Sequence, residues 1–85
     1  FTLKQNYPNP FNPETKINFS IPAKTFVTLK IYSMTGQEVA ELISSDMDAG
    51  EYSLNFSGLK LSSGSYVYRL TAGEFTDSKI MTLIK

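Results

Sequence analysis

The clearest indication of the fold lies in residues 64–85, which read GSYVYRLTAGEFTDSKIMTLIK. Ser65–Leu70 alternates large rings with other residues. Ile80–Ile84 is apolar at both odd and even positions, except for Thr82, so it would present apolar side chains on both faces of a strand. A turn at Ala72-Gly73 separates the two segments, which together predict a hairpin of strands deep in an all-β domain. Four of the last six residues are apolar, so we expect this end of the chain to be docked rather than frayed, and also presented to a partner.

Upstream of this hairpin, three further segments alternate between apolar and polar residues. Thr15–Ile21, Phe26–Tyr32 and Glu51–Phe56 each place apolar side chains at every second position. The residues expected to face inward are Ile17, Phe19, Ile21, Val27, Leu29, Ile31, Tyr52, Leu54 and Phe56. Phe1–Gln5 fits a short edge strand. With turn signals about every 8–12 residues, the pattern predicts an immunoglobulin-like antiparallel β-sandwich of about seven strands.

The segment Gln37–Ile43 is harder to assign, because Val39 and Leu42 fall out of phase. A β-bulge produces such a phase slip. Glu, Ala and Leu instead favour a short helix, which is the competing assignment. We predict the bulged strand.

The composition of two segments predicts that they connect strands. Ser44–Gly50 reads as a polar loop, and Ser57–Gly64 reads as a connection bounded by glycines. Within the second connection, we expect Leu59 and Leu61 to cap the open end of the core.

Residues 1–13, FTLKQNYPNPFNP, form a proline-rich segment with prolines at positions 8, 10 and 13. Proline fixes its own φ and pushes the preceding residue out of the helical region, so we expect a rigid, extended and turning segment. The rings of Tyr7 and Phe11 are expected to attach it to the sandwich. The length of 85 residues favours one domain, 1–85, composed of the proline-rich segment 1–13 and a sandwich 14–85.

Composition excludes several classes of function. Eight basic and eight acidic residues give no net charge. The chain therefore lacks the excess of positive charge that is typical of a nucleic-acid-binding protein. The chain has no His and no Cys, so it lacks the usual catalytic base and the best nucleophile, and we predict that it is not an enzyme. We expect no cofactor and no small-molecule substrate.

Two binding alternatives rest on local clusters of side chains. Three acids close together in a glycine-containing loop suggest calcium, although their spacing lacks the full loop pattern and a plain polar turn is favoured; they are Asp46, Asp48 and Glu51. Three tyrosines suggest stacking on sugars, although tyrosines in strands more often belong to a core with their hydroxyls at its rim; they are Tyr52, Tyr66 and Tyr68.

Four motifs carry a resemblance to a known family. In order they are QNYPNPFNPET, IYSMTGQEV, LSSGSYVYRL and KIMTLIK. Together they resemble the C-terminal sorting domain (type A) of the type IX secretion system of the Bacteroidetes–Chlorobi group, over about residues 3–85. One departure is Phe56-Ser57-Gly58, where many relatives show Trp-Asp/Asn-Gly; Phe keeps the apolar plug.

The resemblance implies a domain at the far end of a larger exported protein. Such a protein folds in the periplasm, is recognised through this domain by an outer-membrane translocon, and is commonly cut by a sortase-like peptidase. Its attached N-terminal cargo is then secreted or held at the cell surface. The chain begins with Phe rather than Met, which fits a piece of a longer protein.

Carried over onto this chain, the motifs of the family give nine candidate recognition residues: Pro8, Asn9, Pro10, Gly64, Tyr66, Lys79, Met81, Leu83 and Lys85. A stiff proline segment loses little entropy when a partner binds it. The last strand would offer main-chain groups for strand addition. The alternatives are that these residues serve conformation only, and that the chain is a structural or carbohydrate-binding immunoglobulin-like module of a secreted enzyme.

Overall fold

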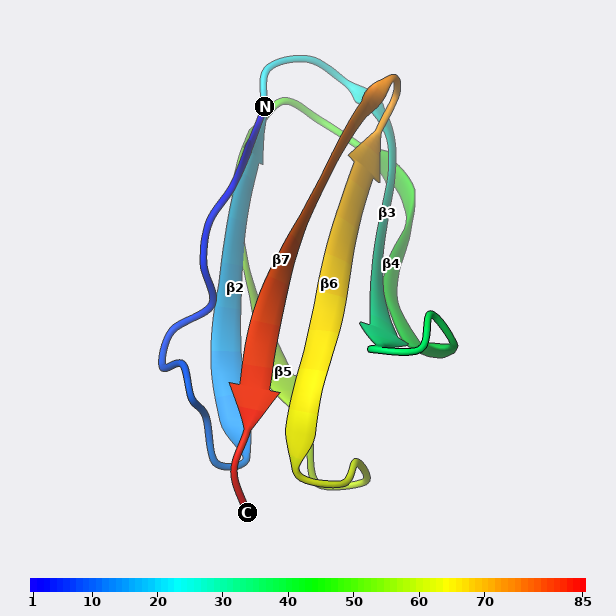
Figure 1. The fold of residues 1–85 in the computed structure, drawn as a ribbon. Helices are drawn as coiled ribbons and strands as arrows, with labels where there is room; N and C mark the ends of the chain where they lie inside the picture. The colour runs from blue at the N-terminus through cyan, green and yellow to red at the C-terminus, as the bar shows by residue number, and fades with distance from the viewer.

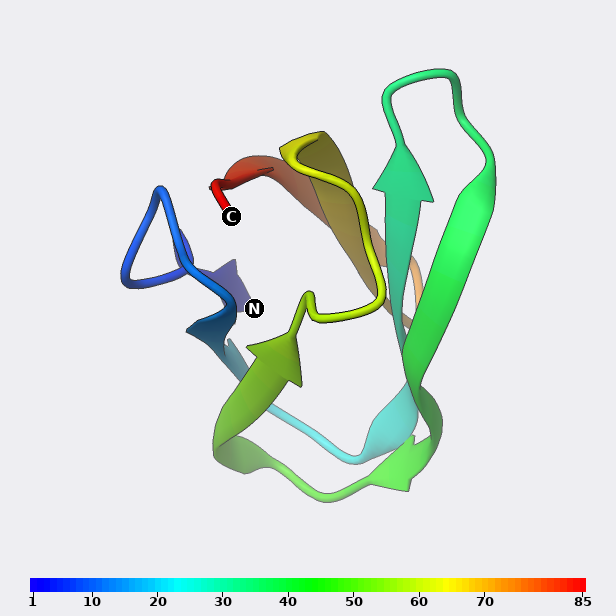
Figure 2. The same cartoon turned by 90° about the horizontal axis from the view of Figure 1, so that it is seen from below.

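The computed structural model describes all of residues 1–85, folded as two antiparallel sheets packed face to face (Figures 1 and 2). The smaller sheet has the order β1-β2-β5, formed by β1 (Thr2–Leu3), β2 (Glu14–Ile21) and β5 (Gly50–Ser57). The larger sheet has the order β4-β3-β6-β7, formed by β4 (Glu38–Met47), β3 (Thr25–Ser33), β6 (Gly64–Ala72) and β7 (Phe75–Leu83). The predicted all-β sandwich of seven strands is confirmed. No helix is long and apolar enough to span a membrane.

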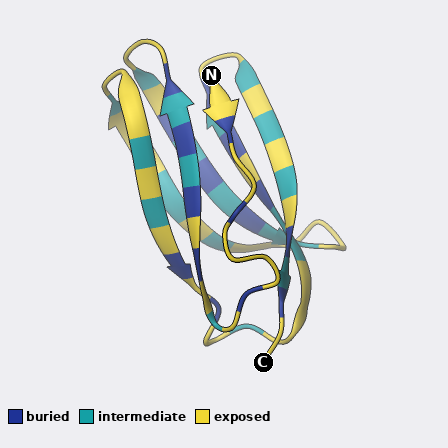
Figure 3. Ribbon diagram, turned by 90° about the vertical axis from the view of Figure 1, so that its left-hand side faces the viewer, coloured by how far each residue is buried: buried dark blue, intermediate teal, exposed yellow.

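The core lies between the inner faces of the two sheets. Its strands alternate between buried and exposed residues, as Figure 3 shows, because successive side chains of a strand point to opposite faces. The buried apolar residues are Leu3, Phe11, Ile17, Phe19, Ile21, Val27, Leu29, Ile31, Phe56, Tyr68, Leu70, Ala72, Met81 and Leu83. The inward positions predicted in β2 and β3 are all among them.

Strand β4 contains the irregularity that its sequence predicts. Its pairing with β3 shifts register twice, so that Leu42 and Val39 have no partner in β3. These two residues are the ones out of phase in the sequence, and the bulged strand is confirmed. The strand also runs on to Met47, where a polar loop was expected from Ser44 onward. That prediction was wrong because the exposed edge of a sheet accepts polar residues on its solvent side.

The last strand lies at the edge of the larger sheet. Because the sandwich has only two sheets, the outer face of this strand is not covered: Ile80 and Ile84 are each 52 % exposed, whereas Met81 and Leu83 are buried. Leu59 does not cap the core as predicted, because its side chain is 67 % exposed. Leu61 does pack against the core.

The proline-rich segment is part of the packed structure. Leu3 and Phe11 are buried in the core, and the ring of Phe1 stacks on Phe75 with centroids 4.9 Å apart. Tyr7 contradicts its predicted role, because its side chain is 80 % exposed. Its neighbour Asn6 is buried, and in an extended chain adjacent side chains point to opposite faces.

Candidate recognition site

The proline-rich segment pairs with the outer edge of β7. The Phe11 N–H donates to the Thr82 carbonyl at 2.9 Å, and the Ile84 N–H donates to the Phe11 carbonyl at 2.9 Å. These bonds make a parallel bridge between Phe11 and Leu83. Two side chains of the segment bond the same edge: Asn9 Oδ1 accepts from the Thr82 N–H at 3.0 Å, and Gln5 Nε2 donates to the Ile80 carbonyl at 2.7 Å.

This pairing corrects the expectation that the last strand offers its main chain to a partner. Between Ile80 and Ile84, main-chain groups on the outer edge are already bonded to the same polypeptide. An incoming strand would first have to displace residues 5–11. No local sequence pattern indicates this pairing, because its partners are more than 70 residues apart.

The ring of Phe11 anchors the segment between the sheets. It is 1 % exposed and lies edge-on to Phe56, with centroids 6.2 Å apart. Gly58 completes the contact, since a Cβ at this position would lie 2.8 Å from Leu83 Cδ2 and 3.3 Å from Phe11 Cε2. The Gly58 N–H donates to the Pro13 carbonyl at 2.8 Å. Only glycine lets the chain approach Phe11 and Leu83 this closely without displacing them.

A buried polar network holds the start of the segment. The Tyr68 hydroxyl accepts from the Asn6 N–H at 2.8 Å and donates to the Lys4 carbonyl at 2.7 Å. The side-chain amide of Asn6 donates through Nδ2 to Thr15 Oγ1 at 3.0 Å and to the Pro8 carbonyl at 3.1 Å. Burial raises the pKa of Tyr68 to about 12; the nearby Asp77 charge raises it too, and the bond from Asn6 opposes the shift. The sequence gives no indication of this network, because an Asn beside Tyr-Pro reads as a turn.

The third and fourth motifs, LSSGSYVYRL and KIMTLIK, lie beside the first. Gly64 pairs with Leu83, and Tyr66 pairs with Met81. Gly64 has a φ of +149°, which favours glycine. The last residue is fixed to the β5–β6 connection: the Lys85 N–H donates to Ser63 Oγ at 3.0 Å and its Nζ donates to the Leu59 carbonyl at 2.6 Å.

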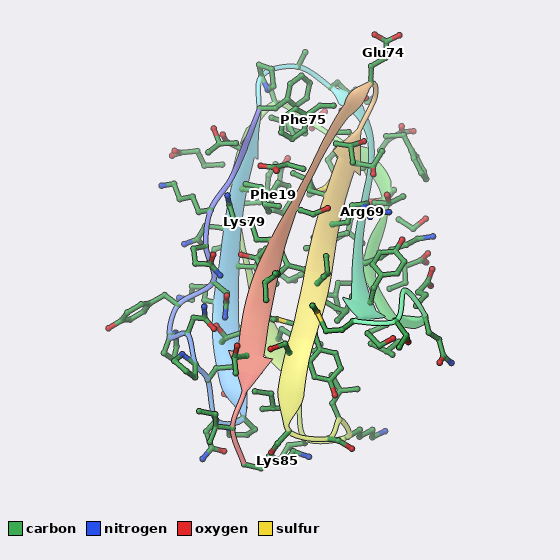
Figure 4. The ribbon with its side chains drawn as sticks, viewed as in Figure 1. Phe19, Arg69, Glu74, Phe75, Lys79 and Lys85 are labelled. Carbon is green, nitrogen blue, oxygen red and sulfur yellow. The ribbon has the colours of Figure 1, made fainter.

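The predicted residues therefore gather at one end of the sandwich, with one exception. Lys79 lies midway along β7 and pairs with Tyr68, whereas Lys85 lies at the lower end (Figure 4). We call this end, composed of residues 7–11, 62–66 and 81–85, the paired end. Its candidate residues differ in burial. Pro8, Asn9, Pro10, Gly64 and Lys85 are exposed, Tyr66 is half-buried, and Met81 and Leu83 are buried.

The alternative sites do not assemble. The three acids at positions 46, 48 and 51 do not form a group that could hold a metal ion. The ring of Tyr68 is fully buried. Tyr52 and Tyr66 are half-buried, and their hydroxyls donate to the carbonyls of Asp48 and Ser62, both at 2.6 Å. Tyr68 therefore offers no platform for a sugar, and the other two rings are only partly exposed.

The chain is thus a small β-sandwich whose residues 5–11 are hydrogen-bonded to its last strand, and distant segments meet at one end. The sequence model of one protein family, the secretion system C-terminal sorting domain, matches residues 5–84, and the chain belongs to this family. No curated protein matches the chain. The domain is thus a sorting signal of the type IX secretion system rather than an enzyme, as the resemblance implied, and it belongs to an exported protein.

Proposed function

We propose that residues 1–85 act as one sorting domain whose paired end is bound by the outer-membrane translocon of the type IX system. The observation that carries the proposal is the convergence of distant motifs. Pro8–Pro10, Gly64–Tyr66 and the last strand are far apart in the sequence, yet hydrogen bonds and strand pairing bring them together. A partner that binds this end contacts a surface that forms only when the domain is folded.

The candidate residues divide into two roles by their exposure. Pro8, Asn9, Pro10 and Lys85 present the surface that the translocon contacts, and the stiffness of the proline segment limits the entropy lost on binding. Tyr66, Met81 and Leu83 position this surface from beneath or beside it, and so does Gly64, which is exposed but has no side chain to present. Lys79, half-buried and midway along β7, extends the contact along the strand.

The placement of the termini supports the same arrangement. Phe1 lies at the end of the sandwich opposite Lys85 (Figure 1). A cargo domain joined before Phe1 therefore leaves the paired end accessible. In this proposal the cargo crosses the periplasm and the outer membrane, a sortase-like peptidase cuts upstream of the domain, and the product is secreted or held at the cell surface.

The test is a reporter fused to residues 1–85 in a host with a type IX system. The double variant Pro10→Ala/Lys85→Glu changes two exposed residues at the paired end. The matched control, Pro22→Ala/Lys24→Glu, makes the same changes at exposed positions of the β2–β3 turn, at the opposite end. We expect the wild type and the control to reach the surface or medium, and the paired-end variant to stay in the periplasm.

Far-UV circular dichroism of the purified variants establishes that each is folded. Surface delivery of the folded paired-end variant at the wild-type level overturns the assignment of the recognition surface. A reporter that stays periplasmic with the wild-type domain overturns the sorting function of residues 1–85.

A further inference from the structure

The two long sides of the sandwich are closed differently. On the side of β2 and β7, the proline-rich segment covers the gap between the sheets and inserts Phe11. On the other side, β4 and β5 are edge strands of different sheets and are not paired with each other (Figure 2). Seven of the nine half-buried apolar residues that pack on the core belong to this side: Ala40, Leu42, Ile43, Met47, Tyr52, Leu54 and Leu61.

An apolar groove lies at the lower end of this open side. It has a volume of about 330 Å³, and five of its seven lining residues are apolar: Val39, Ala40, Phe56, Leu59 and Leu61. The other two are Ser57 and Lys60. Val39 is one of the two bulge residues of β4 and is 36 % exposed, and Leu59 is 67 % exposed. The groove therefore offers apolar surface that no other part of the chain covers.

The main chain of β5 is free along the same side. The Lys4 N–H donates to the Asn18 carbonyl, so Asn18 directs its main chain toward β1 and away from β5. Its partner Ser53 must then direct its own N–H and C=O away from β2. The same reasoning applies to Asn55, whose partner Lys16 bonds Tyr7 in both directions. By contrast, the two bulges of β4 make this edge strand less suited to pair with an added strand.

The open side is also acidic in a chain of zero net charge. Five of the eight acids lie on β4, β5 or the turn between them: Glu38, Glu41, Asp46, Asp48 and Glu51. No Lys or Arg occurs between Ile31 and Leu59, and Lys60 is the one basic residue that lines the groove. Lys30, on the outer face of β3, is 3.2 Å from Glu38 and 3.7 Å from Glu41 and partly offsets these two. The remaining three carboxylates have no ion-pair partner.

We propose that this open side is a second docking site, which takes an extended polypeptide segment with alternating apolar and basic residues. The segment adds as a strand to the free edge of β5, its apolar side chains enter the groove, and its Lys or Arg side chains face the acids. The domain shows the same mode on its other side, where Phe11 bonds the edge of β7 and inserts its ring into the core. This inference is independent of the paired end.

The test uses the full 85-residue chain and the acetylated, amidated heptapeptide KVKLKVK as probe. We expect saturable shifts of the Ser53 and Asn55 amide signals in ¹⁵N NMR spectra, and affinity that falls several-fold from about 50 to about 300 mM NaCl. The acidic peptide EVELEVE is the matched probe and is expected not to bind.

Two variants localise the binding. Ser53→Pro removes an outward N–H that makes no bond within the sandwich, and it is expected to weaken binding about tenfold without unfolding the domain. Leu59→Asp is expected to weaken binding similarly, whereas its control Phe26→Asp, at another exposed apolar residue, is not.

In the titrations, four outcomes overturn the proposal: a blank titration, shifts confined to other strands, equal binding of EVELEVE, or unchanged binding by both Ser53→Pro and Leu59→Asp. Light scattering completes the test. A dimer whose formation shifts the same amides assigns the groove to a second copy of the chain and also overturns it. Reporter delivery is a separate measurement, so this proposal and the proposed function fail independently.

Discussion

Replacement of Phe11 by Ala tests whether the proline-rich segment belongs to the fold. The Phe11 side chain is 1 % exposed and contacts Phe56, and its backbone bonds both Thr82 and Ile84. Truncation of a buried Phe to Ala costs about 3–5 kcal/mol. An 85-residue domain is stable by roughly 5 kcal/mol, at about 0.06 kcal/mol per residue. We therefore expect Phe11→Ala to remove most of the free energy of unfolding.

The measurement is urea denaturation followed by far-UV circular dichroism. Tyr7→Ala is the matched control, because it truncates an aromatic ring in the same segment that is 80 % exposed; it is expected to cost no more than about 0.5 kcal/mol. Amide exchange at Thr82 and Ile84 is expected to accelerate in Phe11→Ala and not in Tyr7→Ala. Equal and small losses in the two variants would refute the packing of the segment described here.

Three further predictions concern contacts of the proline-rich segment. The pKa of Tyr68 is about 12 in the folded chain and about 10 in the unfolded chain. The neutral hydroxyl therefore contributes its full share to the free energy of unfolding below pH 10, and roughly 2–3 kcal/mol of that free energy is lost as the pH rises toward 12. Tyr68→Phe is expected to lack this part of the alkaline loss in denaturation at several pH values, and a loss equal to the wild type would contradict the shift. Gly58→Ala is expected to cost about 1–3 kcal/mol by overpacking against Leu83 and Phe11, and an unchanged urea midpoint would count against the close approach. Asn9→Ala is expected to accelerate Thr82 amide exchange at a cost of about 1 kcal/mol; unchanged exchange would show that the bond is absent in solution.

The sequence was sufficient to predict the strands whose pattern is local. Alternation placed Ile17, Val27 and Leu29 in the core, and the phase slip at Val39 and Leu42 indicated the bulges of β4. These features follow from side-chain period alone. The resemblance added the family and, with it, the sorting function.

The arrangement of the ends was not predictable in the same way. Ile80–Ile84 has the composition of a buried strand, but its exposure depends on whether another layer covers the outer face of its sheet, and residues 5–11 decide how much of its main-chain edge is free. Tyr7 and Phe11 are both rings beside prolines, yet only Phe11 is buried, because the chain bends at residues 8–10 between them. Contacts across more than 70 residues leave no local pattern.

The separation of core and surface among the candidate residues has a practical consequence. Met81 and Leu83 are buried, so their deletion or substitution alters the fold as well as any recognition. A loss of sorting in a variant that lacks Met81–Lys85 is therefore not specific. Exposed residues such as Pro10 and Lys85 separate the two effects, because changes there leave the core intact.

The central claim is that the translocon touches the paired end of the folded domain. Photocrosslinking in exporting cells tests this most directly, with a photoreactive residue in place of Lys85 or, as control, of the exposed Lys24 at the opposite end. The paired-end position is expected to yield adducts with an outer-membrane translocon protein, and the Lys24 position is not. Equal adducts from both positions, or adducts from position 24 alone, would contradict the claim.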